Sequence, residues 1–99
     1  EIKRVLAWIL VGSGKLEQAT SLYEQLLETP RPDDYLNSGF CKWICAQIVE
    51  AVELFRKYAD ACGSNGFNAE MEFRRERELL QRNGIGDVEI RLMIDMLTA

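Results

Sequence analysis

When the sequence is aligned with itself after a shift of 32 residues, similar residues meet, and this internal repeat restricts the fold more than any other feature. The shift aligns the following pairs: Ala7 with Gly39, Gly14 with Ala46, Leu16 with Ile48, Ala19 with Ala51, Leu22 with Leu54, Tyr23 with Phe55, and Leu26 with Tyr58. A small residue on each helix of a pair lets the two backbones approach, and a large residue fills the space beside them. The repeat therefore predicts two helical hairpins that pack in similar ways.

The spacing of apolar residues is that of amphipathic helices, and signals for strands are poor. Apolar side chains recur every three or four residues over 16–27 and again over 49–62, with polar and charged residues between them. Residues 2–11 and 35–48 are more apolar. Their equivalent places in the repeat predict that both are helices. The expected fold is all-α, with about six helices.

Prolines and short polar segments mark the expected boundaries. Pro30 and Pro32 are expected to end the first repeat, and Asp33 or Asp34 to cap the helix that follows. Residues 63–68 form the clearest loop. The prediction is a single helical domain, 1–99, made of repeat 1 (1–31), repeat 2 (33–63) and a closing helical pair (68–99) in which Asp87 caps the last helix.

Two segments resemble the second-helix core of the tetratricopeptide repeat, a two-helix unit of about 34 residues. They are 14–23, reading GKLEQATSLY, and 48–55, reading IVEAVELF. The spacing of 32 is slightly shorter than usual, and Lys42 stands where the family has a large apolar residue. The resemblance implies antiparallel helical hairpins stacked as a short α-solenoid. Because the chain begins with Glu1 inside an apolar helical pattern, we expect it to be a fragment of a longer protein.

Several classes of function are made improbable by what the chain lacks. It has no histidine, which is the commonest general base and metal ligand, so we expect no enzyme, no cofactor and no metal site. The net charge of −4 argues against nucleic acid as a partner. The longest apolar run, 5–11, is far shorter than the roughly 20 residues of a membrane-spanning helix, so no membrane partner is expected.

Two short patterns have simpler structural interpretations. Residues 12–15, reading GSGK, lack the remaining residues of a phosphate-binding loop and are interpreted as a tight turn between helices. The three cysteines, Cys41, Cys45 and Cys62, are too few for a disulfide framework and suit small buried positions. Free thiols are typical of a cytoplasmic protein.

The family resemblance implies that the first helix of each unit lines a concave groove that binds a peptide or a partner's helix. The groove residues that it implies are Arg4, Trp8, Val11, Leu36, Asn37, Phe40 and Trp43. Tryptophan and arginine are among the residue types that dominate binding hot spots. The alternative is that Trp8 and Trp43 pack against neighbouring helices, because tryptophan is mostly buried.

The sequence thus predicts a protein–protein interaction module whose protein or peptide partner is unknown. One alternative is a self-associating or capping helical fragment, with a homodimer formed through the first or the last helix. The first helix is apolar nearly all round, and the last carries Leu92 and Met96 beyond its main apolar stripe. A further alternative is a helical part of a transcription regulator.

Overall fold

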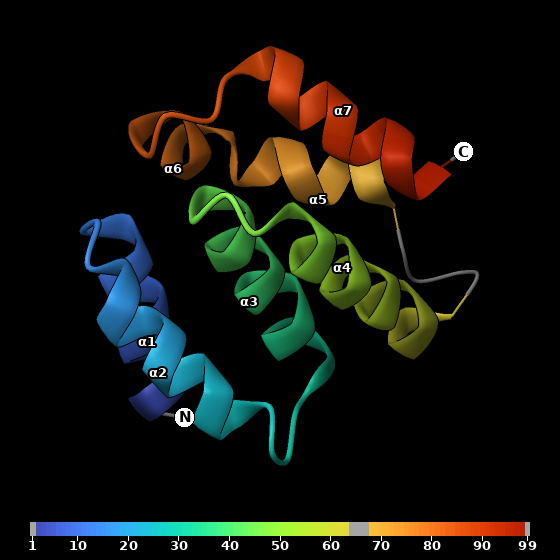
Figure 1. The fold of residues 1–99 in the computed structure, drawn as a ribbon. Helices are drawn as coiled ribbons and strands as arrows, with labels where there is room; N and C mark the ends of the chain where they lie inside the picture. The colour runs from blue at the N-terminus through green and yellow to red at the C-terminus, as the bar shows by residue number, and fades with distance from the viewer. Residues whose placement is uncertain (1, 64–67, 99) are drawn as a thin grey trace.

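The computed structural model describes residues 2–63 and 68–98, and the regular secondary structure in these residues is entirely α-helical. The all-α prediction is therefore confirmed. Figure 1 shows the arrangement of the helices. They are α1 (Ile2–Gly12), α2 (Leu16–Leu26), α3 (Pro32–Ile44), α4 (Ile48–Cys62), α5 (Ala69–Arg75), α6 (Arg77–Arg82) and α7 (Asp87–Thr98).

The turns of the first two hairpins have the same hydrogen bonds at equivalent positions of the repeat. Lys15 N–H donates to the Leu10 carbonyl and Gln47 N–H to the Lys42 carbonyl, each at 2.9 Å. Between them, Gly14 and Ala46 both have a positive φ, of 77° and 64°. This combination is the Schellman motif, which ends a helix on a left-handed residue. The predicted turn at 12–15 is confirmed.

The turn between α6 and α7 has the same motif, although the sequence there does not follow the internal repeat. Gly84 has a φ of 87°, and Ile85 N–H donates to the Leu80 carbonyl at 2.9 Å. The C-terminal part therefore ends in a third helical hairpin. Its first arm is divided into two helices.

The predicted closing pair is wrong in number, because the described residues 68–98 contain three helices. A single helix over 69–83 is interrupted at Glu76, where neither glycine nor proline occurs. After the interruption, Leu79 packs in the cluster of α1 and α2, whereas Leu80 packs with Phe73 in the other cluster. Burial raises the pKa of the Glu76 carboxyl at this break. The short helix α6 thus contributes side chains to both apolar clusters.

Two apolar clusters form the core. One joins α3 and α4 to α5–α7, and the other joins α1 and α2 to Cys41 of α3 and Leu79 of α6. Trp8 and Ile44 pack against both clusters and connect them. The radius of gyration is 12.4 Å, close to the value of about 13 Å expected for a compact domain of this length.

Helix α3 lies at the centre of the packing. It contacts α1 and α2 on one side and α4 on the other, while α7 contacts α4, α5 and α6. Figure 1 shows α5, α6 and α7 lying together beside the ends of the hairpins at which α1 and α3 finish. None of the helices in the described residues combines the length and apolarity needed to cross a membrane.

The expected caps differ in detail from the observed ones. Helix α3 begins at Pro32, which is favoured in the first turn, so Asp33 and Asp34 lie within the helix rather than before it. Asp34 still caps the N-terminus of α3, because its carboxylate accepts a hydrogen bond from the Arg31 N–H at 2.8 Å. Of the predicted loop 63–68, residues 64–67 lie outside the described residues.

Candidate protein interface

The residues expected to line a groove are mostly inside the protein. Their side chains fall into two groups: Val11, Leu36, Phe40 and Trp43 are buried, and Arg4, Trp8 and Asn37 are half-buried. Phe40 and Val11 have no exposed surface. The alternative that Trp8 and Trp43 pack against neighbouring helices describes both residues. Trp43 is buried, and the half-buried Trp8 has its ring centroid 6.2 Å from that of Phe40. The predicted groove is not an open surface in this structure.

The C-terminal helices α5–α7 cover the residues that were expected to line the groove. Phe73 of α5 meets Phe40 with their ring centroids 5.3 Å apart, and its ring centroid lies 5.0 Å from that of Phe55. The Trp43 indole N–H donates to the Glu89 carboxylate of α7 at 2.8 Å. Leu79 of α6 packs in the same cluster as Val11. Sequence periodicity identified these faces as apolar but gave no means of placing α5–α7 upon them.

Arg4 has an internal partner instead of a place in a groove. Its guanidinium donates to both carboxylate oxygens of Asp34, at 2.9 Å from Nε to Oδ1 and 2.9 Å from Nη2 to Oδ2. The Asp34 side chain is almost fully buried, and such a carboxylate requires a cation or several donors. This ion pair fastens α1 to the first turn of α3.

The surface that stands out is the outer face of α1. Four large aliphatic side chains of this helix line a shallow hollow of about 370 Å³: Ile2, Val5, Leu6 and Ile9. Their exposed fractions are 85% for Ile2, 59% for Val5, 45% for Leu6 and 57% for Ile9. A contiguous exposed aliphatic face of this kind marks an interaction site in many soluble proteins.

The apolar run over 5–11 contained the signal for this face. Ala7 and Val11 point into the core, and Val5 and Ile9 point outward from the same helix. A helix that is apolar on all sides needs cover on two sides. The predicted site residues were taken from the family resemblance, so these outward residues were missing from them.

A second exposed stripe lies on α7. Val88, Leu92 and Met96 follow one another at intervals of four residues and are 85%, 49% and 38% exposed. Residues four apart lie on one face of a helix. The stripe is smaller than the α1 face and is flanked by charged side chains.

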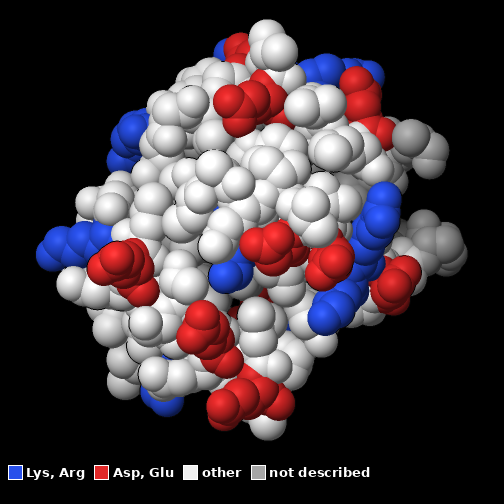
Figure 2. Space-filling model, in the orientation of Figure 1, with Lys and Arg blue, Asp and Glu red and all other residues white. Residues whose placement is uncertain are grey.

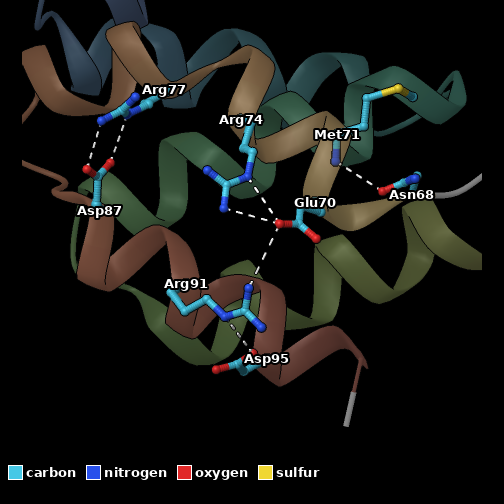
Figure 3. Close-up of polar contacts among 8 residues, drawn as sticks. All are labelled: Asn68, Glu70, Met71, Arg74, Arg77, Asp87, Arg91 and Asp95. Carbon is cyan, nitrogen blue, oxygen red and sulfur yellow. Dashed lines mark hydrogen bonds and ion pairs between the residues drawn. The ribbon is translucent and has the colours of Figure 1, made fainter.

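Ion pairs within and between α5, α6 and α7 engage most of the arginines of this region (Figure 3). Glu70 binds Arg74 at 3.1 Å and lies 3.9 Å from Arg91, which in turn binds Asp95 at 3.2 Å. Arg75 pairs with Glu72. The exposed pairs contribute little each, whereas the pair of Arg75 involves the buried carboxylate of Glu72.

Asp87 belongs to the same set of contacts. Arg77 reaches its carboxylate at 2.8 Å, and the hydrogen bond from Arg77 lowers the pKa of Asp87. On the face seen in Figure 2, basic side chains are scattered among acidic ones and do not gather into one area.

The surroundings of the Cys41 thiol disfavour reactivity. Cys41 is buried, its sulfur lies 3.6 Å from the Thr20 hydroxyl, and burial raises the pKa of its thiol. A thiol with a raised pKa is a poor nucleophile. In the part of the chain that the structure describes, no three cysteine or acidic residues lie together as a metal-binding group.

These features define a helical chain with an exposed aliphatic helix face. Neither a family model, nor a curated protein, nor a solved structure matches the chain. The α1 face (Ile2, Val5, Leu6 and Ile9) is the candidate interface.

Proposed function

We propose that this chain is a protein–protein interaction module that binds its partner through the α1 face. The observation that carries the proposal is the set of four exposed aliphatic side chains around an apolar hollow, uncovered in a chain whose other apolar faces are mostly packed. Burying such side chains contributes about 25 cal/mol per Å² of apolar surface removed from water. A partner with a complementary apolar surface therefore gains binding energy without any rearrangement of the core.

We further propose a tetratricopeptide-like arrangement for the two N-terminal hairpins. Three observations support it: the equal turns at Gly14 and Ala46, the small residues at equivalent helix positions, and the contacts of α3 with both helices of the preceding hairpin. In this arrangement each new hairpin is laid on the last. The C-terminal helices α5–α7 close one side of the stack.

A photo-crosslinking experiment tests the binding surface. The photoreactive residue p-benzoylphenylalanine replaces Val5 in one sample and Glu53, on the exposed side of α4, in the matched control. A partner that is cross-linked from Val5 but not from Glu53 is then purified. Its affinity for the wild-type chain is compared with that for Ile9→Glu and for Glu53→Lys.

We expect Ile9→Glu to weaken binding of the purified partner by about tenfold or more, because a carboxylate is then buried without a cation. Glu53→Lys should leave the affinity unchanged. Since Ile9 is 57% exposed, both variants should fold, which circular dichroism checks. Equal affinities for Ile9→Glu and the wild type would show that the α1 face is not the binding surface.

A second candidate function is self-association through α7. It is supported by the stripe of Val88, Leu92 and Met96, which is exposed at one end of the chain. Sedimentation at micromolar concentration tests it. A dimer that Leu92→Glu converts to a monomer supports self-association, and a wild-type monomer excludes it at that concentration.

A further inference from the structure

The kind of partner that fits the α1 face can be inferred from the way the protein covers the equivalent face of α3. This inference rests on the proposed function. Helix α3 corresponds to α1 in the internal repeat, because Gly39 aligns with Ala7 and the turn at Ala46 repeats the turn at Gly14. The two helices therefore present equivalent faces at equivalent positions.

One face of α3 receives the preceding hairpin. Its residues Asp34, Ser38 and Cys41 lie on one side of the helix and are at most 2% exposed. The hairpin α1–α2 supplies the contacts, through Arg4 on Asp34 and Thr20 beside Cys41. This face is thus an internal interface between one hairpin and the next.

The same positions on α1 are uncovered. In the internal repeat, the residues 32 positions before Asp34, Ser38 and Cys41 are Ile2, Leu6 and Ile9. These are three of the four residues of the α1 face; the fourth, Val5, corresponds to the half-buried Asn37. The exposed surface therefore coincides with the surface that, one repeat later, is covered by a helical hairpin.

We propose that the occupant of the α1 face is a helical hairpin, seated on α1 as α1–α2 is seated on α3. The chemistry of the partner follows from the differences between the two faces. Ile2 stands at the α1 position that is equivalent to Asp34. A partner arginine equivalent to Arg4 would therefore be desolvated there without a carboxylate to pair with. The partner hairpin consequently has an aliphatic residue at that position.

A second copy of this chain does not meet that requirement. Its own α1–α2 hairpin has Arg4 at the contact position, and the edge on which the contact depends is already engaged with α3. The occupant is therefore a hairpin of the same architecture but with a different, apolar edge.

A tandem fusion provides the test. A copy of residues 1–32 carrying Arg4→Leu is joined directly before residue 1 of the full chain, which preserves the spacing of 32. Hydrogen–deuterium exchange of the original α1 is followed by mass spectrometry. We expect exchange in α1 to slow by about tenfold or more relative to the unfused chain, and the melting temperature to rise.

Two matched fusions serve as controls. One retains Arg4 in the added copy, and the other carries Leu6→Lys in the original α1. Both should protect α1 less than the Arg4→Leu fusion, because each puts a cation into the new contact. Equal exchange in all the fusions and in the unfused chain would overturn the hairpin proposal. So would a wild-type dimer that Ile9→Glu converts to a monomer, because the occupant would then be a second copy.

The failure of this inference is distinguishable from the failure of the proposed function. If the fused hairpin leaves α1 unprotected while Ile9→Glu still weakens a purified partner, the α1 face binds a partner of another shape. If the fusion protects α1 but Ile9→Glu has no effect on any cross-linked partner, the proposed function fails and the repeat geometry stands.

Discussion

Gly39 and Phe55 are in such close contact that a Cβ atom on Gly39 would lie 2.5 Å from a carbon of the Phe55 ring. This contact sets the distance between α3 and α4, the two helices that share the largest interface of the fold. Phe55 is buried and also packs against Phe40 and Phe73, so its ring has no free space into which to move.

Gly39→Ala should therefore destabilise the protein, although alanine is favoured over glycine in helices by about 1 kcal/mol. We expect a net loss of about 1–3 kcal/mol in the free energy of unfolding, measured by urea titration, because overpacking a rigid core forces the helices apart. Phe55→Leu should reduce the additional loss caused by Gly39→Ala. Independent effects of the two substitutions would contradict the contact.

Ala46 occupies a backbone conformation that suits glycine better. Its φ of 64° is equivalent to the 77° of Gly14, in a turn with the same hydrogen bonds. The left-handed conformation costs an L-residue about 1–2 kcal/mol, and part of this is offset by the greater entropy of glycine in the unfolded chain. Ala46→Gly should raise stability by up to about 1 kcal/mol, which thermal unfolding will show.

Gly14→Ala is the matched control for this prediction. A Cβ atom at Gly14 meets nothing within 4 Å, so only its backbone conformation opposes alanine. The substitution should lower stability by a similar amount. Opposite signs at these two equivalent positions are the expected result, and a loss of stability in Ala46→Gly would contradict it.

The repeat was visible in the sequence because it is encoded in local features. Small residues such as Ala7 and Gly39, and the turn-forming Gly14, are determined by contacts within one hairpin. The all-α fold and the hairpin turns followed from them. The interruption at Glu76 did not, because neither glycine nor proline marks it, and the clusters in which Leu79 and Leu80 pack are formed with helices distant in sequence.

The burial of the predicted site residues could not be predicted from the sequence either, because it also depends on helices distant in sequence. Trp43 and Phe40 have the composition of a binding groove, but composition does not show whether another part of the chain lies over them. Glu89 and Phe73, which do so, belong to helices far along the chain. The α1 face was partly foreseeable, since a helix that is apolar on all sides has more apolar surface than one packed face can bury.

The ion pair between Arg4 and Asp34 provides a third prediction. Arg4→Leu leaves a buried carboxylate without its cation, and we expect a loss of about 3 kcal/mol or more. Asp34→Asn keeps an oxygen that can accept the Arg31 N–H, so it should cost less. A double-mutant cycle measured by urea unfolding should give a coupling energy of about 1–3 kcal/mol.

Additive effects of Arg4→Leu and Asp34→Asn would show that this ion pair contributes nothing to the joining of α1 and α3. The exposed pair of Arg91 and Asp95 is a suitable comparison, because both side chains are more than half exposed and lie four residues apart on α7. Its coupling energy should be about 0.5 kcal/mol or less, and it should fall with added salt.

Tyr23 combines a buried ring with a hydroxyl that has no hydrogen-bond partner among the described residues. An unpaired buried hydroxyl costs about 1–3 kcal/mol. Tyr23→Phe should therefore leave stability at neutral pH unchanged or raise it by up to about 1 kcal/mol, in contrast to the usual loss when a bonded tyrosine is truncated. A loss greater than about 1 kcal/mol would show that the hydroxyl has a partner.

The same residue should make stability depend on alkaline pH. Burial, assisted by Cys41 and Asp34, raises the pKa of the Tyr23 hydroxyl above its value of about 10 in the unfolded chain. Below about pH 10 the hydroxyl is protonated in both states and adds no pH dependence. As the pH rises further, the unfolded chain releases this proton and the folded chain keeps it, so stability falls by up to about 1.4 kcal/mol per pH unit. Tyr23→Phe lacks this proton, and urea unfolding between about pH 9 and 11 should give a shallower decline than in the wild type. Parallel declines would mean that Tyr23 ionises equally in both states.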